Sequence, residues 1–387
     1  MKDSALDFIP FSLPDLGEDE ISEVVDTLRS GWITTGPKVR QFEVDFQKFI
    51  GGGVEAIAVN SATAGLHLAL EALNVSKGDE VIVPSLTFTA TAEVVRYLEA
   101  DVKIVDVNSV SLNIDLKAIK GAITSKTKAI VLVHYAGLSC NMDEIFLLAK
   151  EFGLKVVEDA AHALPTTYKG DMIGSLESDI TVFSFYANKT MTTGEGGMVV
   201  TRNSDLAKRM KIMRLHGIDR DAFDRFQSKK PAWYYEVVAP GFKYNMTDIA
   251  AAIGIHQLKK IPRFLNRRQY LAKRYFDSLA DLPLTLPLDD VDGGTHSWHL
   301  FVIRMQDNSP VNRDELIQIL SDQGIGSSVH YVPLHRQPYW RDKYQLTIDM
   351  FPVAEKEYQA MLSIPLYTAM SDEQQDKIIQ VLREALT

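Results

Sequence analysis

The sequence predicts an α/β fold with a mostly parallel central sheet flanked by helices, followed by a smaller C-terminal α+β domain. Helix patterns and strand patterns alternate from about residue 18 to residue 200. The predicted strands are short and continuously apolar, which is typical of parallel strands covered on both faces. After Thr201 this alternation ends. We expect a large domain over residues 1–258 and a small domain over residues 259–387.

The first part of the chain alternates regularly between the two patterns. The segment "EDEISEVVDTLRSG" is predicted to be a helix with Ile21, Val24, Val25 and Leu28 on one apolar face, and Gly31 suits its end. The elements expected next are the strand "AIAV", the helix "ATAGLHLALEAL", the strand "EVIVP", the helix "ATAEVVRYL", the strand "VKIVDV", the helix "LKAIKGAI", the strand "KAIVLVHY", the helix "MDEIFLLAKEFG", the strand "LKVVED" and the apolar runs "ITVFSF" and "GMVVT".

The second part of the chain is less regular. Residues 218–244 are predicted to be irregular and are rich in aromatic side chains. Pro262 is expected to interrupt a helix that begins in "NMTDIAAAIGIHQLKKI", and a second helix is expected to run from there to about Ala280. The remaining predicted elements are a strand in "SWHLFVIRM", a helix near 312–323, a strand in "GSSVHYV" and a helix after Ser371.

The composition limits the class of protein. The 387 residues are 46% hydrophobic and carry a net charge of -10 without a Lys/Arg block, so we expect no nucleic-acid partner. The single cysteine, Cys140, allows no disulfide within the chain and suits a reducing compartment. No signal peptide and no apolar run of about 20 residues are found, so we expect a cytoplasmic protein without a membrane partner.

Polar side chains follow several predicted strands, at the edge where ligands bind in open parallel sheets. The residues expected to converge at this edge are Ser61, Ala62, Thr63, Ser85, Thr87, Phe88, Glu158, Asp159, His162, Asn188 and Lys189.

Three of these sites have an ordinary alternative interpretation. "NSATAGLHLAL" offers backbone N–H groups and hydroxyls at a helix start, which suits a phosphate, but a plain N-cap explains the same residues. "GEGG" is not a dinucleotide fingerprint. Asp159 and His162 resemble a metal pair but lack a third ligand, so we expect no metal. A buried carboxylate at Asp159 suits another role, because it can keep a ring nitrogen protonated.

Lys189 follows an apolar run and precedes "GEGG". Taken alone, it is an ordinary solvated loop lysine. A lysine beside a phosphate-bearing heteroaromatic aldehyde can instead form a Schiff base, if its pKa is lowered. Helix-start hydroxyls, Phe88, Asp159 and the Ser184–x4–Lys189 spacing together are the parts of a pyridoxal phosphate site.

An ordered set of motifs resembles the sugar aminotransferases of the DegT/DnrJ/EryC1/StrS family. The similarity spans residues 11 to about 260 and extends through "WHLFVIR" and "SSVHYVPLHRQPYW". Within the family, it is strongest to the UDP-4-amino-4-deoxy-L-arabinose–oxoglutarate aminotransferases. The family's fold type I aminotransferase architecture agrees with the predicted elements. The motifs are "GWITTGPKVRQFE", "NSATAGLHLAL", "GDEVIVPSLTFTATA", "VHYAG", "VEDAAHA", "FSFYANKTMTTGEGGMVVT" and "GFKYNMTDIAAAIG".

The resemblance implies roles for the cofactor-binding residues. Lys189 forms the Schiff base and moves the proton, Asp159 pairs with the pyridinium nitrogen, and Phe88 stacks on the ring. His162 contacts the phenolic side of the cofactor, at a position that is Gln in many relatives. The family is dimeric with shared active sites, so either Lys243 or Asn245 reaches the neighbouring phosphate. The phosphate ligands implied within the chain are Ala62, Thr63 and Ser184.

The resemblance also implies a reaction. Glutamate donates its amino group, leaving 2-oxoglutarate and pyridoxamine phosphate, and a nucleotide-linked keto sugar, expected to be a 4-keto sugar, receives it. Such amino sugars serve cell-surface polysaccharide or lipopolysaccharide synthesis. Alternatives are a sugar-nucleotide dehydratase with the same cofactor, a nicotinamide dehydrogenase, and a non-catalytic sugar-nucleotide-binding protein. Candidate substrate contacts are Trp32, Thr34, Thr35, Gly36, His330 and Tyr331, although buried packing explains Trp32 and Tyr331 equally well.

Overall fold

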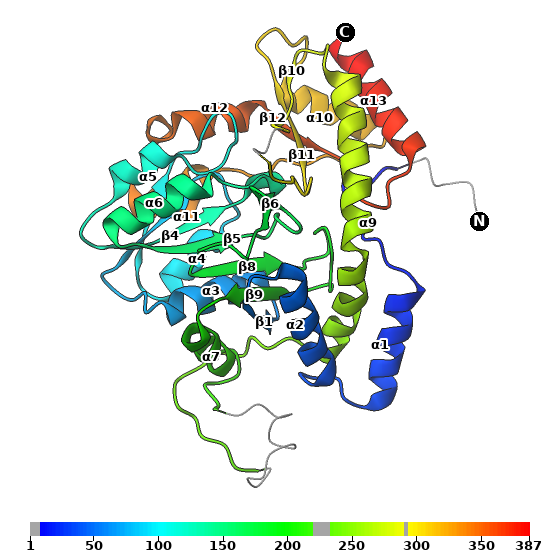
Figure 1. Cartoon of the computed structure of the whole chain (residues 1–387). Helices are drawn as coiled ribbons and strands as arrows, with labels where there is room; N and C mark the ends of the chain where they lie inside the picture. The colour runs from blue at the N-terminus through cyan, green and yellow to red at the C-terminus, as the bar shows by residue number, and fades with distance from the viewer. Residues whose placement is uncertain (1–7, 220–232, 290–292) are drawn as a thin grey trace.

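A seven-stranded sheet organises the computed structural model, which describes residues 8–219, 233–289 and 293–387 (Figure 1). The strand order is β1-β9-β8-β5-β4-β2-β3. Neighbouring strands from β8 to β3 are parallel, and β9 alone runs antiparallel to both of its neighbours. The mostly parallel sheet is therefore confirmed. Its strands are β1 (Glu55–Val59), β2 (Glu80–Pro84), β3 (Asp101–Val105), β4 (Thr127–Val133), β5 (Lys155–Asp159), β8 (Ile180–Ser184) and β9 (Gly197–Thr201).

Helices cover both faces of this sheet because successive strand residues point to opposite sides. Val131 and Val157 pack on the face of α3 (Ala62–Ala72), α4 (Ala90–Tyr97) and α7 (Ser204–Met213). Ile130 and Val156 pack on the face of α2 (Pro37–Ile50), α5 (Leu116–Ala122) and α6 (Met142–Phe152). Each fully buried Val or Ile contributes about 1.5–3 kcal/mol. A slip of one residue would exchange the two faces, so packing fixes the register.

Helix α2 begins at a distant carboxylate. Asp248 is fully buried, and its side chain accepts hydrogen bonds from the backbone N–H groups of Gly36 (2.8 Å), Lys38 (3.1 Å) and Val39 (3.0 Å). A carboxylate stabilises a helix N-terminus because the first N–H groups have no partner within the helix. The loop before α2 is thereby fastened to the helix that carries Asp248.

That helix, α9 (Asp248–Leu279), continues through Pro262, so the predicted interruption at this residue is wrong. A proline inside a helix removes one hydrogen bond and costs about 3 kcal/mol. Buried Ile261 and Phe264 on either side of Pro262 hold α9 against the core of the large sheet. Packing therefore outweighs the low helix propensity of proline. The predicted boundary between residues 258 and 259 falls inside α9, and the division into two domains stays a prediction.

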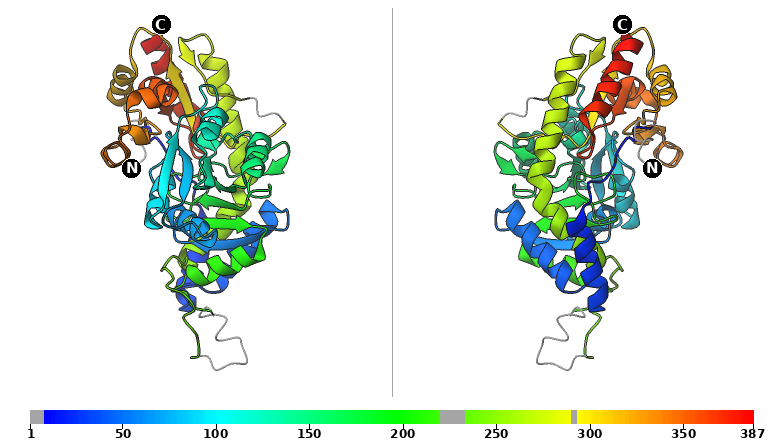
Figure 2. Two further views of the ribbon diagram at one scale, coloured as in Figure 1. Left: turned by 90° about the vertical axis from the view of Figure 1, so that its left-hand side faces the viewer. Right: turned by 90° about the vertical axis from the view of Figure 1, so that its right-hand side faces the viewer.

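A second, three-stranded antiparallel sheet lies near the C-terminus (Figure 2). Its core includes Tyr275 and Leu279 from the later part of α9. The predicted strand in "GSSVHYV" is wrong, because only Ser328 forms an isolated bridge, to Ser363. The elements of this region are β10 (Leu284–Thr285), β11 (Phe301–Met305), α10 (Arg313–Asp322), α11 (Pro338–Tyr344), α12 (Pro352–Ala360), β12 (Met361–Ile364) and α13 (Asp372–Leu386).

Helix α1 (Glu18–Ser30) forms as predicted but turns the opposite face to the protein. It lies beside α9 (Figures 1 and 2), with Glu20 and Thr27 buried. Glu20 pairs with Lys260 at 2.6 Å, while Ile21 and Leu28 are 53% and 54% exposed. Much of the predicted apolar face is therefore exposed, because polar pairing to α9 orients the helix.

The other described elements are short, and no helix in residues 8–219, 233–289 and 293–387 is long and apolar enough to cross a membrane. The predicted cytoplasmic location stays a prediction, and the predicted irregular stretch 218–244 lies partly outside the described residues. The short elements are β6 (Thr167–Tyr168), β7 (Asp171–Met172) and the 3-10 turns Tyr135–Gly137, Leu334–Arg336 and Ile348–Met350.

Candidate active site

A pocket of about 420 Å³ lies at the carboxyl ends of the parallel strands. The start of α3, the loops after β2, β5 and β8, and the segment around residue 330 form its wall. The strand-end convergence expected from the sequence is thus present in space, except that Ser85 and Glu158 do not line the pocket. The predicted site residues that line it are Ala62, Thr63, Phe88, Asp159, His162, Ser184, Lys189, His330 and Tyr331.

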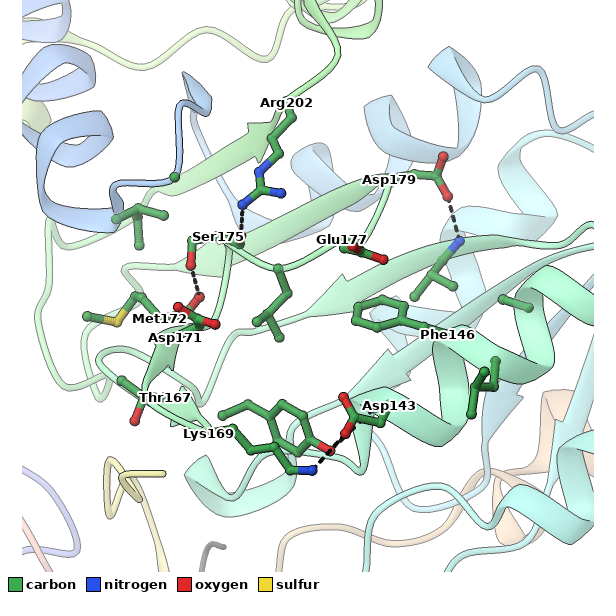
Figure 3. Close-up of a pocket in the computed structure, with 18 of the residues that line it drawn as sticks. Asp143, Phe146, Thr167, Lys169, Asp171, Met172, Ser175, Glu177, Asp179 and Arg202 are labelled. Atoms are coloured by element: carbon green, nitrogen blue, oxygen red, sulfur yellow. Dashed lines mark hydrogen bonds and ion pairs between the residues drawn. The ribbon is translucent and has the colours of Figure 1, made fainter. Parts of the chain in front are cut away.

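A larger groove of about 1180 Å³ lies elsewhere, beside α6 and the β6–β7 hairpin (Figure 3). Several of its charged side chains already have partners within the chain. Lys169 pairs with Asp143 at 2.7 Å, Arg202 donates to the carbonyl of Ser175, and Asp179 accepts from Val156 at 2.9 Å. None of the predicted site residues lines this groove. We therefore assign the chemistry to the smaller pocket.

Asp159 ends β5 with both carboxylate oxygens engaged. Its Oδ2 accepts from the Thr91 hydroxyl at 2.8 Å, and its Oδ1 accepts from the backbone N–H of Ala161 at 3.1 Å. Burial raises the pKa of this carboxyl, while these hydrogen bonds and the nearby Lys189 act in the opposite direction. A carboxylate held in this way can stabilise a positive charge on a ligand in the pocket.

Lys189 lies in the loop between β8 and β9, and its backbone N–H donates to the carbonyl of Tyr186 at 3.0 Å. The loop is closed by backbone hydrogen bonds from Phe185 to Gly196 (2.9 Å) and from Thr193 to Phe185 (3.0 Å). Burial lowers the pKa of Lys189 to about 8, and Asp159 limits the decrease. About a tenth of its amine is therefore neutral, and hence nucleophilic, at pH 7, far more than for a lysine with the ordinary pKa of 10.5.

An anion cradle lies at the start of α3. The Ser61 side chain caps the helix by accepting from Ala64 N–H at 3.1 Å. Within the described residues, the N–H groups of Ala62 and Thr63 have no acceptor and remain available to a ligand. The N-cap does not exclude an anion at this helix start, because Ser61 uses only one of the helix's first N–H groups. Ser184 lines the same pocket.

Gly197 permits this cradle. A Cβ at this position would lie 2.8 Å from Ala62 N and 2.9 Å from the carbonyl of Phe183. Such distances are too short for a carbon, so β9 can approach the start of α3 only with glycine here. Free N–H groups, a hydroxyl, a buried carboxylate and a lysine of lowered pKa suit a phosphate-bearing cofactor with a basic ring nitrogen.

His162 and Asp159 do not form a metal pair. His162 Nδ1 accepts from the N–H of Ala136 at 3.2 Å, and Nε2 contacts the Tyr331 hydroxyl at 2.9 Å. Both ring nitrogens of His162 are therefore engaged in hydrogen bonds within the chain. The described part of the chain holds no group of three His, Cys, Asp or Glu side chains that suits a metal ion.

Phe88 and Tyr331 flank the pocket with ring centroids 5.8 Å apart. Phe88 is 57% exposed, which leaves its face open to a planar ligand. His330 stacks on Phe11 at 5.2 Å, and its Nδ1 contacts the Ser363 hydroxyl at 2.9 Å. His330 is therefore held in place by Phe11 and by Ser363 of β12 in the three-stranded sheet.

Six predicted residues do not line the pocket of their own chain. Trp32 Nε1 donates to the carbonyl of Thr35 at 3.1 Å, and its ring covers Gly36 so closely that a Cβ there would lie 1.8 Å from Nε1. Asn245 Nδ2 donates to the Thr35 hydroxyl at 2.6 Å, and Lys243 donates to Asn245 Oδ1. These residues, with Thr34, form one polar loop cluster that does not line the pocket of Lys189.

Thr91, which binds Asp159, and two residues that line the pocket were missed by the sequence analysis, whereas Thr87 was expected at this edge. Thr91 binds Asp159, and Thr87 binds Thr91 at 2.8 Å, so two threonines hold the carboxylate from α4 and its preceding loop. The sequence feature that could have indicated this pair is the spacing of Thr87 and Thr91, four residues apart in "TFTAT". Tyr186 and Glu195 also line the pocket, and nothing in their spacing distinguishes them from loop residues.

Comparison with known proteins gives a consistent result. The family model described as DegT/DnrJ/EryC1/StrS aminotransferase family matches residues 14–383. The spore coat polysaccharide biosynthesis protein SpsC of Bacillus subtilis is 45% identical over 379 residues, 97% of each chain. A structure from Streptococcus pneumoniae, described as "Putative sugar aminotransferase Spr1654, PMP-form", is 36% identical and covers 97% of this chain and 98% of its own, with a TM-score of 0.90. Its PLP form has a TM-score of 0.89 at 36% identity, covering 98% and 100%.

Proposed function

The chain belongs to the DegT/DnrJ/EryC1/StrS aminotransferase family, and from this premise we propose that it transfers an amino group from glutamate to a nucleotide-linked keto sugar. It is a pyridoxal-phosphate-dependent sugar aminotransferase of amino-sugar biosynthesis, with pyridoxal and pyridoxamine phosphate as cofactor forms. The proposal adds the 4-keto position, the nucleotide, the glutamate donor with its product 2-oxoglutarate, and a role in cell-surface polysaccharide or lipopolysaccharide synthesis.

The residues of the pocket fit this cofactor. We propose that the N–H groups of Ala62 and Thr63 and the Ser184 hydroxyl hold the phosphate, and that Phe88 covers the ring. Asp159 would hold the proton of the ring nitrogen. When bound, the cofactor supplies a covalent acceptor for amino groups and a ring that stores the electrons of a broken C–H bond.

Lys189 supports the transfer in two ways. With its pKa at about 8, it offers a neutral amine to the cofactor's aldehyde carbon and leaves again when a substrate amine takes its place. Once free, the amine at Nζ takes the proton from the substrate carbon and returns it at the cofactor side. Asp159 favours both steps because its negative charge stabilises the positive ring.

The observation that carries the proposal is the joint presence of Lys189 and Asp159 in one pocket beside the cradle. The test is incubation of the pyridoxamine form with UDP-, GDP- and dTDP-linked keto sugars, followed by product analysis. Return of the pyridoxal absorption with an amino sugar as product supports the proposal. Loss of water from the sugar would identify a dehydratase, and binding without reaction would identify a sugar-nucleotide-binding protein.

The lowered pKa of Lys189 predicts how the apoprotein takes up pyridoxal phosphate. Only the neutral amine attacks the aldehyde, so the initial rate of colour formation should rise about tenfold per pH unit below pH 8 and level off above it. A lysine with the ordinary pKa of 10.5 would keep the rate rising up to that pH. Stopped-flow absorption from about pH 6 to about pH 10 measures this profile, and a rise that continues beyond about pH 9.5 would contradict it.

We propose that the active unit is a homodimer whose partner covers α1. The exposed apolar residues Ile21, Val25 and Leu28 form one stripe on this helix, which an isolated chain would leave in water. The loop cluster of Trp32, Thr34, Thr35, Gly36, Lys243 and Asn245 lies away from its own pocket and would then reach the partner's pocket, while His330 and Tyr331 contact the substrate from within the chain.

Light scattering should therefore give a mass of twice 43.3 kDa. Leu28→Glu places a charge in the proposed contact and should weaken the dimer about tenfold or more. Leu147→Glu is the matched control, because Leu147 is a helix leucine that is 68% exposed elsewhere on the molecule. A monomeric wild-type protein, or equal dimer stability in the two variants, would contradict the proposed contact.

A further inference from the structure

The hydrogen bonds of His162 determine which ring nitrogen carries its proton. The backbone N–H of Ala136 points at Nδ1 over 3.2 Å, and a backbone N–H can only donate. Nδ1 must therefore present its lone pair. A neutral His162 then carries its hydrogen on Nε2, which faces the Tyr331 hydroxyl at 2.9 Å.

The surroundings of His162 keep it neutral. The residue is buried, and its ring lies 4.3 Å from that of His299, measured between centroids. Burial and the nearby charge of Lys189 hold the pKa of His162 well below its ordinary value. A second proton would also break the bond from Ala136. His162 Nε2–H is thus a fixed donor to Tyr331.

The Tyr331 hydroxyl consequently uses its capacity to accept a hydrogen bond and keeps its capacity to donate one. Its oxygen accepts from His162, and its own hydroxyl proton has no acceptor among the described residues. Burial raises the pKa of Tyr331, so the phenol keeps that proton across the working pH range. Tyr331 lines the pocket together with Lys189 and Phe88.

We propose that Tyr331 donates a hydrogen bond to an oxygen of the pocket's occupant, and that His162 is the positioning residue which sets the direction of this bond. The inference rests on the proposed function. It reverses the roles expected from the family, since both nitrogens of His162 are already used and Tyr331 makes the contact. The acceptor is an electron-rich oxygen conjugated to the reacting centre, either the cofactor's phenolic oxygen or the keto oxygen of the sugar.

The proton position on His162 is directly measurable. In protein labelled with ¹⁵N at its nine histidines, a His162→Gln sample identifies the His162 signals by their loss. We expect a neutral ring with the hydrogen on Nε2 from about pH 6 to about pH 9. Hydrogen on Nδ1, or a cationic ring near neutral pH, would overturn the proposal. This measurement needs no sugar and no turnover, so it is independent of the proposed function.

Tyr331→Phe removes the donor and keeps the ring. If the acceptor is the phenolic oxygen, the donor withdraws negative charge that otherwise holds the proton on the Lys189-bound nitrogen. Its loss should raise the pH midpoint of the bound cofactor's absorption change by about one unit. If the acceptor is the sugar's keto oxygen, the midpoint stays and the KM of the best keto sugar from the panel rises about tenfold. An unchanged midpoint together with an unchanged KM would overturn the proposal.

Two His162 variants separate positioning from mere packing. Glutamine can accept from Ala136 with its carbonyl and donate to Tyr331 with its amide, so His162→Gln should keep the wild-type midpoint and KM. His162→Leu fills the space without either bond and should reproduce the Tyr331→Phe change. Equal behaviour of the Gln and Leu variants would show that His162 does not set the bond. Tyr339→Phe, at a tyrosine that is 57% exposed, controls for loss of a phenol outside the pocket.

Discussion

Lys189→Ala is expected to lose the absorption band of covalently bound pyridoxal phosphate and to lower kcat by at least about a thousandfold. The reason is that one amine serves both as the covalent partner of the cofactor and as the carrier of the proton. Absorption spectra and single-turnover transfer from glutamate measure the two losses separately. The fold should be retained, because Lys189 lies in a loop whose closing bonds are made by the backbone of Phe185, Thr193 and Gly196.

The matched control is Lys77→Ala. Lys77 is an exposed lysine that pairs only with Glu99, at 3.7 Å and on the surface. Such a pair contributes little to stability, so spectrum and turnover should equal those of the wild type. Added ethylamine should restore part of the proton transfer in Lys189→Ala, since it supplies a free amine to the vacated space. A Lys189→Ala protein with the wild-type absorption band would refute the assignment.

Asp159→Asn is expected to lower kcat about a hundredfold to a thousandfold while the cofactor still binds. Asparagine has the shape of aspartate and can still accept from Ala161 N–H, but it carries no negative charge. The ring nitrogen would then lose the charge that keeps it protonated, and the ring would store electrons less well. Rapid-mixing measurement of each half-reaction, at saturating cofactor, tests this result.

Thr91→Val distinguishes charge from position at the same site. This variant keeps the Asp159 carboxylate and removes one of its hydrogen bonds, the 2.8 Å bond from the Thr91 hydroxyl. We expect a loss of about tenfold in kcat, which corresponds to one ordinary hydrogen bond. If Thr91→Val were as damaging as Asp159→Asn, geometry rather than charge would explain the role of Asp159. Unchanged turnover in Asp159→Asn would exclude the role.

Local patterns were enough for most of the sheet and its covering helices. Runs such as "EVIVP" and "KAIVLVHY" are strands because buried parallel strands need apolar residues on both faces, and that demand is local. The pattern failed where a distant residue outweighed it. α1 is oriented by the pairing of Glu20 with Lys260, and α9 passes through Pro262 because its flanks are buried. The local sequence of α1 does not show its pairing with Lys260, and the local sequence of α9 does not show which residues bury its flanks.

The pocket was predictable to the same extent. Asp159 and Ser184 end strands and Lys189 follows one, and the strand-end rule brings such residues together without further information. Thr91 is the second residue of α4, and its bond to Asp159 spans 68 residues of sequence. Trp32 was expected near the substrate and Asn245 near the neighbouring subunit's phosphate, and neither lines the pocket of its own chain.

The sequence by itself determined the sheet, the order of its elements and the lysine, carboxylate and helix start that meet at its edge, because periodicity and strand ends are properties of adjacent residues. Only the tertiary structure decided the states of these groups. Burial lowers the pKa of Lys189 to about 8, and Ala136 decides which nitrogen of His162 carries the proton that faces Tyr331. Desolvation and hydrogen-bond direction depend on neighbours brought together by folding, and these neighbours are far apart along the chain.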